Sequence, residues 1–255
     1  MRILRTMRTA IGAAGLAASL AAGLTATALS QQSAAPAPEL PPLSDIPAAQ
    51  ERPDDHVMGA EDAPVLMIEY ASFACPHCAH FQEDVWPVIR DEFVETGQVR
   101  YVLRPMLTAP PQLAAAGVIL AECAAEDRYF DAADLLFAEQ AAIFQAAQSG
   151  GDVLGVYNRV AAAVGVSPEQ LMACFNDPAT NAAVNNAARQ AQADGVQSTP
   201  SFFISGKHLT IAAADGGTWY MWGGDPLIIN GERVPGQIDE DSFRRIILHF
   251  LDAAE

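Results

Sequence analysis

The sequence predicts an α/β protein with a helical region inserted between its strands. Three observations lead to this fold class. An apolar run at residues 65–70 is followed directly by a helical pattern. An Ala-rich stretch with helical spacing occupies residues 111–194, and an amphipathic pattern closes the chain at residues 243–251. The elements therefore follow in the order strand, helix, strand, long helical region, strand, extended chain and helix.

The N-terminal segment has the composition of an export signal. Three arginines among the first eight residues precede an uncharged stretch, residues 11–29, that is rich in Ala, Leu and Gly. Small residues at Ala26 and Ala28 fit a signal-cleavage rule, so we expect residues 1–30 to be a cleaved signal peptide. The folded part is then expected in the periplasm or another exported, oxidising space. An uncleaved membrane anchor is the alternative, because the stretch approaches the length of a bilayer-spanning helix.

A linker and one large domain account for the rest of the chain. Residues 31–53 are rich in Pro and Ala, which predicts an extended and poorly packed linker. The domain then spans residues 54–255, with the helical insertion at about residues 111–194. The formal net charge is −17, and without the leader arginines 11 basic and 31 acidic residues remain. This acidic balance disfavours nucleic acid and anionic membrane surfaces as partners.

The elements can be justified in chain order. The strand at residues 65–70 is interrupted only by Glu69. The helix that follows has one apolar face, and Pro87 inside it predicts a kink. Residues 99–103 alternate well enough for a second strand.

The later elements have equally local signals. Gly150-Gly151 predicts a break in the helical region, and Ser167-Pro168 predicts a new helix with Ser167 as its N-cap. Residues 201–205 are expected to form a buried strand. The last helix has apolar residues at i, i+3, i+4, i+7 and i+8. These are Phe243, Ile246, Ile247, Phe250 and Leu251.

The motif Cys75-Pro76-His77-Cys78 lies between the first strand and the first helix. Unpaired amides at a helix N-terminus favour thiolate over thiol, so the pKa of Cys75 should fall below the usual value of about 8.5. Cys78 is within reach, and the pair can open and close as a redox disulfide. Pro76 fixes the φ that the first helical turn needs. A protonated His77 would add to the thiolate's stability; an ordinary surface histidine is the alternative.

Further motifs strengthen this interpretation. Asp62-Ala63-Pro64-Val65, the run from Glu69 to Cys78, and the later run Gly195 to Ile204 with its Thr199-Pro200 all resemble the DsbA family of exported thiol–disulfide oxidoreductases. The resemblance covers roughly residues 54–251 and departs from the family at residues 207–229. It implies a thioredoxin fold, a central mixed sheet flanked by helices, with an inserted helical domain.

The resemblance also implies roles for residues outside the Cys-Pro-His-Cys motif. Pro200 is expected to be cis and to pack against the redox disulfide, which exposes the Thr199 backbone to an extended client segment. An ordinary trans proline that begins an edge strand is the alternative. Glu69 is expected beneath the active site, where it assists proton movement, with Arg104 as a possible charge partner. A carboxylate that faces solvent is the alternative.

Cys123 and Cys174 lie on separate apolar helical stripes. In an oxidising compartment we expect one structural disulfide within the helical insertion, which resembles a DsbA subgroup. A loop of that length would contribute roughly 4 kcal/mol in the chain-entropy model. Two buried free thiols are the alternative. A second redox pair is less favoured, because neither cysteine lies at a helix start.

Residues 207–229 hold Trp219, Tyr220 and Trp222 among glycines. They are interpreted as an insertion between the strand at residues 201–205 and a closing strand near residues 227–229. An extended hairpin that packs its own aromatics is expected, and an exposed client-binding flap is the alternative.

Three functions remain in competition. The first is a DsbA-type dithiol oxidase, because a stable thiolate makes the disulfide form a strong oxidant. The second is a disulfide isomerase or reductase, since Thr199 before the proline also occurs in isomerase-like relatives. The third is a metal- or haem-binding protein that uses the two cysteines and nearby histidines. Ala79 occupies the position of a haem-attachment histidine, and His80 points away from the cysteines on a helix.

We expect no cofactor and no metal at this site. The expected partners are reduced or unfolded exported client proteins. By resemblance, a quinone-linked membrane protein would reoxidise an oxidase.

Overall fold

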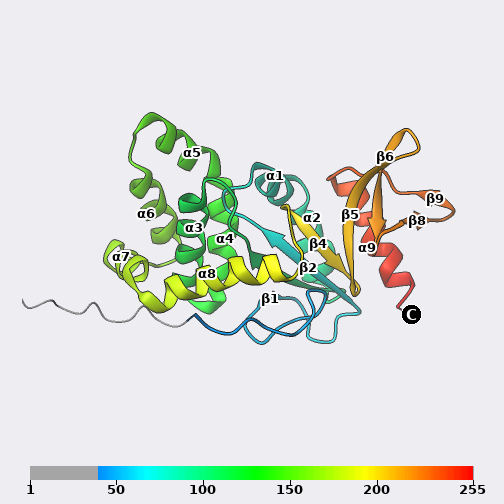
Figure 1. The fold of residues 1–255 in the computed structure, drawn as a ribbon, viewed down its shortest axis with the longest axis horizontal. Helices are drawn as coiled ribbons and strands as arrows, with labels where there is room; N and C mark the ends of the chain where they lie inside the picture. Colours follow the sequence, from blue (N-terminus) through cyan, green and yellow to red (C-terminus); the bar gives the residue numbers. More distant parts are fainter. Residues whose placement is uncertain (1–39, 255) are drawn as a thin grey trace, which may run out of the picture. The chain divides into compact units, whose positions relative to one another are not determined.

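The computed structural model describes residues 40–254 (Figure 1). The predicted signal peptide, residues 1–30, and the first part of the predicted linker lie outside these residues. Within residues 40–254, no helix combines the length and the hydropathy that a membrane crossing requires.

A seven-stranded mixed sheet forms the centre of the fold, in the order β1-β3-β2-β4-β5-β6-β7. β2 and β3 are parallel, as expected for two strands joined by a helical crossover. The other pairs in the sheet are antiparallel. The strands are β1 His56–Met58, β2 Val65–Ala71, β3 Val99–Pro105, β4 Ser201–Ile204, β5 Lys207–Ala214, β6 Gly217–Trp222 and β7 Asp225–Pro226, with β8 Ile228–Ile229 and β9 Glu232–Arg233 in a separate pair.

Helices occur in the places that the sequence predicts. Those of the long helical region lie together beside the sheet, in green to yellow in Figure 1. Gly150 ends α5 in the left-handed conformation, and Ser167 caps α7. The helices are α1 Pro76–Asp84, α2 Trp86–Ile89, α3 Pro111–Cys123, α4 Tyr129–Ala138, α5 Gln140–Ser149, α6 Val153–Ala163, α7 Pro168–Asn176, α8 Pro178–Ala193 and α9 Glu240–Asp252, with a π-helical turn η1 Arg90–Val94 and a 3-10 turn η2 Glu126–Arg128.

The predicted kink in the first helix is a complete interruption. α1 ends at Asp84, Val85 joins it to α2, and Pro87 lies in the first turn of α2. Proline has no N–H to donate to the preceding turn and is tolerated only where that donor is free, at a helix start. The chain therefore starts a new helix at this point.

Different helices pack on the two faces of the sheet. On one face, Phe81 of α1, Phe202 of β4 and Phe243 of α9 form a triangle with ring centroids 4.8–5.1 Å apart. On the other face, Tyr70 and Phe203 pack with residues from the end of α8. The alternating side chains of β2 and β4 thus separate the face covered by α1 and α9 from the face covered by the end of α8.

The second half of the predicted linker is packed. Arg52 is buried, and its guanidinium bonds both carboxylate oxygens of Asp194 at 2.7 and 2.9 Å. Ser44 also bonds Gln190 of α8. Composition predicted an extended linker, but a specific buried ion pair, which composition does not reveal, holds residues 44–53 on the domain.

The prediction for residues 207–229 is wrong in its topology. Ser205 and Gly206 have φ values of 47° and 88°, which suit a two-residue hairpin turn. β5 therefore pairs directly with β4, and residues 228–229 pair with β9 outside the main sheet. Because the turn is short, β4 pairs with the segment that follows it directly, residues 207–214, and not with the more apolar residues 227–229.

Aromatic residues of this hairpin pack inward. Tyr220 is buried against Phe243, and Trp222 lies 5.0 Å from Phe250 of α9. The indole N–H groups of Trp219 and Trp222 donate to the carbonyls of Ala214 and Ile204. These contacts favour the packed hairpin over the exposed flap.

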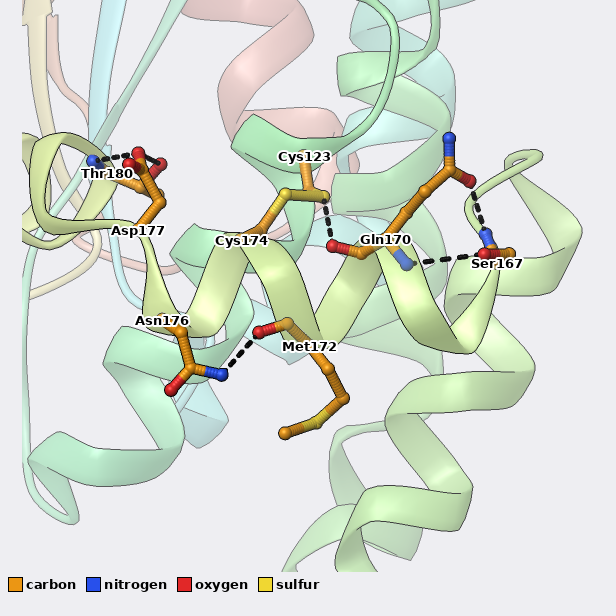
Figure 2. The surroundings of a disulfide bond; sticks show 8 residues. All are labelled: Cys123, Ser167, Gln170, Met172, Cys174, Asn176, Asp177 and Thr180. Atoms are coloured by element: carbon orange, nitrogen blue, oxygen red, sulfur yellow. Dashed lines mark hydrogen bonds between the residues drawn. A yellow bond between two sulfur atoms is a disulfide. The ribbon is translucent and has the colours of Figure 1, made fainter.

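A disulfide joins Cys123 at the end of α3 to Cys174 in α7, with Cα atoms 6.1 Å apart (Figure 2). The figure also shows the cap that starts α7. Ser167 Oγ accepts from the Gln170 amide, and Gln170 Oε1 accepts from the Ser167 amide. The disulfide and this capping box fix α7 against the rest of the helical region.

Candidate functional site

The two motif cysteines occupy different environments at the end of β2. Cys75 is the N-cap of α1 and is 8% exposed, whereas Cys78, in the first turn, is 0% exposed. Pro76 and His77 between them are exposed, and His77 lines a hollow together with Pro200. A reactant from solution can therefore approach Cys75 but not Cys78.

The surroundings of Cys75 favour its thiolate. Its pKa falls to about 5, chiefly because the Cys78 thiol hydrogen-bonds to the sulfur. Burial opposes this shift, and the Thr199 side chain and the backbone amides of Cys78 and His77 add to it. The predicted effect of helix-start amides is thus present. The contribution of His77 comes from its backbone.

Cys78 has the opposite character. Burial raises the pKa of its thiol, and the charges of Glu69 and Cys75 raise it further. The Ser72 amide donates to its sulfur at 3.5 Å. One sulfur of the pair is thus a ready nucleophile, while the other holds its proton.

The Thr199–Pro200 peptide is cis, and it lies against the motif. Cys75 Sγ is 3.3 Å from the Thr199 carbonyl oxygen. Thr199 Oγ1 is buried and has no protein partner in residues 40–254 apart from the sulfur whose pKa it lowers. A hollow of about 510 Å³ opens next to this peptide, and its lining includes His77, Thr199, Pro200, Ser201, His208 and Ile211.

Glu69 lies beneath the motif and is 0% exposed. Tyr101 donates its hydroxyl to Glu69 Oε2 at 2.6 Å, and Gln82 donates to the same oxygen at 3.2 Å. Burial, with the nearby Cys75 charge, raises the pKa of Glu69 to about 8. The carboxyl group therefore carries a proton at neutral pH.

Arg104, the possible charge partner of Glu69, does not pair with it. Glu69 lies opposite Leu103 in the β2–β3 register, and Arg104 lies opposite Tyr70. Neighbouring residues of a strand point to opposite faces, so the two side chains are separated by the sheet. Arg104 instead forms a buried ion pair with Asp55 at 2.7 Å.

One residue near the motif had no signal in the sequence. Gln140, at the start of α5, is buried, and its Nε2 donates to the carbonyls of Phe73 and Cys75 at 2.9 and 3.1 Å. Its side chain clamps the loop that carries the nucleophile. One of three glutamines in an Ala-rich helix does not reveal a contact with a loop 65 residues earlier.

The metal-binding alternative would use the two cysteines together with nearby histidines. In the described part of the chain, no three His, Cys, Asp or Glu side chains are placed to hold an ion together. His80 pairs with Asp84 one turn along α1 instead of turning toward the cysteines.

A family model described as Thioredoxin matches residues 51–215. Among curated proteins, a candidate protein-disulfide oxidoreductase of Rickettsia typhi is 29% identical over 154 residues, which are 60% of this chain and 55% of the relative. The chain thus spans about half the length of the curated relatives it matches.

Two solved structures share the fold. α-DsbA1 of Wolbachia pipientis has a TM-score of 0.59 at 23% identity, over 80% of this chain and 94% of that chain. Oxidised BdbD of Bacillus subtilis has a TM-score of 0.57 at 20% identity, over 78% and 93% of the two chains. These likenesses confirm the predicted fold, a mixed sheet flanked by helices with an inserted helical domain.

Proposed function

The chain belongs to the thioredoxin family, and we propose that it is an exported thiol–disulfide oxidoreductase of the DsbA type. The observation that carries this proposal is the opposite character of two sulfurs three positions apart. Cys75 is accessible and has a pKa of about 5, whereas Cys78 is sealed and its pKa is raised. Thiol–disulfide exchange needs one sulfur that attacks and leaves easily and another that stays with the protein.

The reaction starts from the Cys75–Cys78 disulfide. A client thiolate attacks Cys75 Sγ, the bond to Cys78 breaks, and Cys78 leaves as a thiolate that takes up a proton. A second client thiolate then attacks the client sulfur of the mixed disulfide and releases Cys75 as a thiolate. The client loses two electrons to the Cys75–Cys78 pair and becomes a disulfide.

The low pKa of Cys75 favours the oxidising direction. A sulfur that is stable as a thiolate is a good leaving group, and its stability favours the reduced enzyme over the disulfide. The disulfide form is therefore a strong oxidant of clients. Isomerase or reductase activity is the second candidate, because a threonine before the cis proline resembles the isomerase-like members of the fold.

The client segment would lie along the cis peptide. Thr199 and Pro200 line the hollow, the Thr199 carbonyl oxygen is 3.3 Å from Cys75 Sγ, and the backbone before β4 can pair with an extended chain. Reduced or unfolded exported proteins fit this mode, since their cysteines lie in extended segments. The arginine-rich leader and the proposed oxidation of client thiols both support an exported, oxidising location. A quinone-linked membrane protein would then be the oxidant that restores the Cys75–Cys78 disulfide.

A direct test combines two activities and one titration. Purified protein should oxidise a synthetic peptide with two cysteines, and reduce insulin more slowly than it oxidises the peptide. Thiolate absorbance at 240 nm should titrate near pH 5 in the reduced protein and vanish in the Cys75→Ser variant. A Cys75 that titrates like free cysteine would reject the proposal.

A further inference from the structure

The loop that carries Thr199 is short and has two fixed ends. Residues 195–200, the cis-proline loop, join Asp194, the C-cap of α8, to Ser201, the first residue of β4. The Thr199 carbonyl oxygen lies 3.3 Å from Cys75 Sγ. Because the loop is short, a shift of either end would move the atoms beside the nucleophile.

Tyr70 of β2 holds both ends of the cis-proline loop. Its backbone lies opposite Ser201 in the β2–β4 register. Its hydroxyl donates to Asp194 Oδ2 at 2.6 Å. Tyr70 is 1% exposed, so these contacts lie in the interior of the protein. One residue of the central sheet therefore closes the base of the loop.

Arg52 fixes the same carboxylate from a distant part of the chain. Its guanidinium donates to both Asp194 oxygens, at 2.7 and 2.9 Å, from a position 142 residues earlier. A planar fork that bonds both oxygens constrains the orientation of a carboxylate as well as its distance, whereas a single donor leaves the orientation free. The arginine therefore holds the end of α8, and with it the start of the cis-proline loop, in one place.

A buried arginine could also bind an anionic ligand, but the donors of Arg52 are directed at the protein. Besides Asp194, they reach the Ile46 carbonyl, from Nε at 3.2 Å and from Nη2 at 2.8 Å. Nη1 also lies 3.5 Å from the Tyr70 hydroxyl. All three guanidinium nitrogens thus have protein acceptors, which favours a positional role over a ligand site.

A second buried ion pair nearby lacks the connection to the loop. Arg104 and Asp55 are 2.7 Å apart and their side chains are 7% and 6% exposed, against 3% and 7% for Arg52 and its partner. Arg104 also donates to the Tyr70 hydroxyl and to two backbone carbonyls of residues 48–50. Both arginines hold the segment before β1 on the domain, but Arg52 is the one that bonds the base of the cis-proline loop.

We propose that Arg52 is a positioning residue of the redox site, which through Asp194 fixes the cis-proline loop so that Thr199 stays against Cys75. Residues 44–53 then belong to the redox machinery, although their composition predicts a linker. Arg52 acts through the loop and not on the reacting atoms. The inference rests on the proposed function.

A double-mutant cycle tests whether Arg52 acts through Thr199. Arg52→Gln removes the paired donors, so the pKa of Cys75 should rise by about half a unit as the Thr199 hydroxyl loses its place beside the thiolate. In a Thr199→Val background that hydroxyl is already absent, and adding Arg52→Gln should change the pKa by less than about 0.2 units. Thiolate absorbance at 240 nm gives the four values. Equal shifts in the two backgrounds would overturn the inference.

Arg104→Gln is the matched control, because it breaks a similarly buried ion pair and loosens the same segment without removing a bond to Asp194. Both variants should melt at a lower temperature than the unmodified protein, since each leaves a buried carboxylate without its partner. The control should leave the pKa of Cys75 within about 0.2 units of its original value. Equal pKa shifts in the two variants, or no shift in Arg52→Gln, would reduce Arg52 to a structural role.

Milder variants keep the test available if the glutamine variants do not fold. Arg52→Lys and Arg104→Lys retain the charge but lack the planar fork, and the same comparison of pKa values applies. The titration needs no client, so the two hypotheses fail separately. An ordinary Cys75 pKa in an unmodified protein that does not oxidise a two-cysteine peptide rejects the proposed function. A low pKa and an active protein with an additive cycle reject the role of Arg52 alone.

Discussion

Cys75 Sγ lies 3.3 Å from the carbonyl oxygen of Thr199, a residue 124 positions later in the chain. This contact brings the helix start after β2 and the loop before β4 into one site. The Thr199 hydroxyl adds to the thiolate's stability, so the loop contributes to the chemistry of the nucleophile as well as to the shape of the site.

Replacing Thr199 by valine tests that contribution. Thr199→Val keeps the branched shape and removes the hydroxyl, so the pKa of Cys75 should rise, by about one unit for the loss of one hydrogen bond to a charged group. The pKa is read from thiolate absorbance at 240 nm. Thr218→Val, at an exposed position on β6, is the control. An unchanged pKa would show that the amides and Cys78 suffice.

The Gln140 clamp makes a second prediction. Gln140→Met keeps the chain length but removes both donors to the Phe73 and Cys75 carbonyls. The loop should lose its fixed geometry, and the negative ends of two carbonyl dipoles should be left without a donor, so the pKa of Cys75 should rise.

The same titration measures this effect, with the exposed Gln145→Met as control. We expect a shift of about half a unit, or a threefold lower thiolate fraction well below the pKa. A variant that melts earlier but titrates like the unmodified protein would reduce Gln140 to a packing role.

Glu69 predicts a fall in stability as pH rises. Its pKa in the fold is about 8, above the ordinary value of 4.5, so the unfolded chain loses its proton first. The stabilising effect of the neutral carboxyl is complete below pH 4.5 and is lost as pH rises toward 8.

Urea denaturation of the oxidised protein at several pH values measures this slope without interference from free thiols. The Cys75 charge is absent there, so the upper end of the window should lie below 8, but burial, the larger cause, remains. Glu69→Gln should remove the slope. A slope that persists in the variant would assign it to other groups.

The Cys123–Cys174 disulfide should be a structural element. The double substitution Cys123→Ala and Cys174→Ala should lower the free energy of unfolding by about 2–5 kcal/mol, because the unfolded chain gains the freedom of a long loop. The pKa of Cys75 should not change, since the disulfide joins α3 to α7 (Figure 2). A loss below about 0.5 kcal/mol would argue against this role.

Several contacts of the fold could not be predicted from the sequence and became known only from the structure. The Arg52–Asp194 ion pair places part of the predicted linker on the domain. The turn at Ser205 and Gly206 decides that β5, not residues 227–229, pairs with β4. The packing of the linker depends on one ion-pair partner, and the β4–β5 pairing depends on one turn. The composition of a region does not reveal either.

The sequence by itself determined β2, β3, β4, the helical region, α9 and the reactive pair, but not β1 or the strand order after β4. Periodicity identified these elements because burying an apolar face imposes a period of 2 or 3.6 on the side chains. The motif identified the low-pKa sulfur because two of its causes are local: the Cys78 thiol, which is the largest, and the amides of His77 and Cys78 lie within three residues of Cys75.

Only the tertiary structure decided which distant groups surround that sulfur. Glu69 has Tyr101 and Gln82 as partners instead of Arg104, and Gln140 holds the loop from the helical region. The Glu69 contacts exist because the face of β3 that carries Tyr101 turns toward α1, and the Gln140 contact exists because α5 begins beside the Cys75 loop. Packing among elements far apart in the chain determines both arrangements.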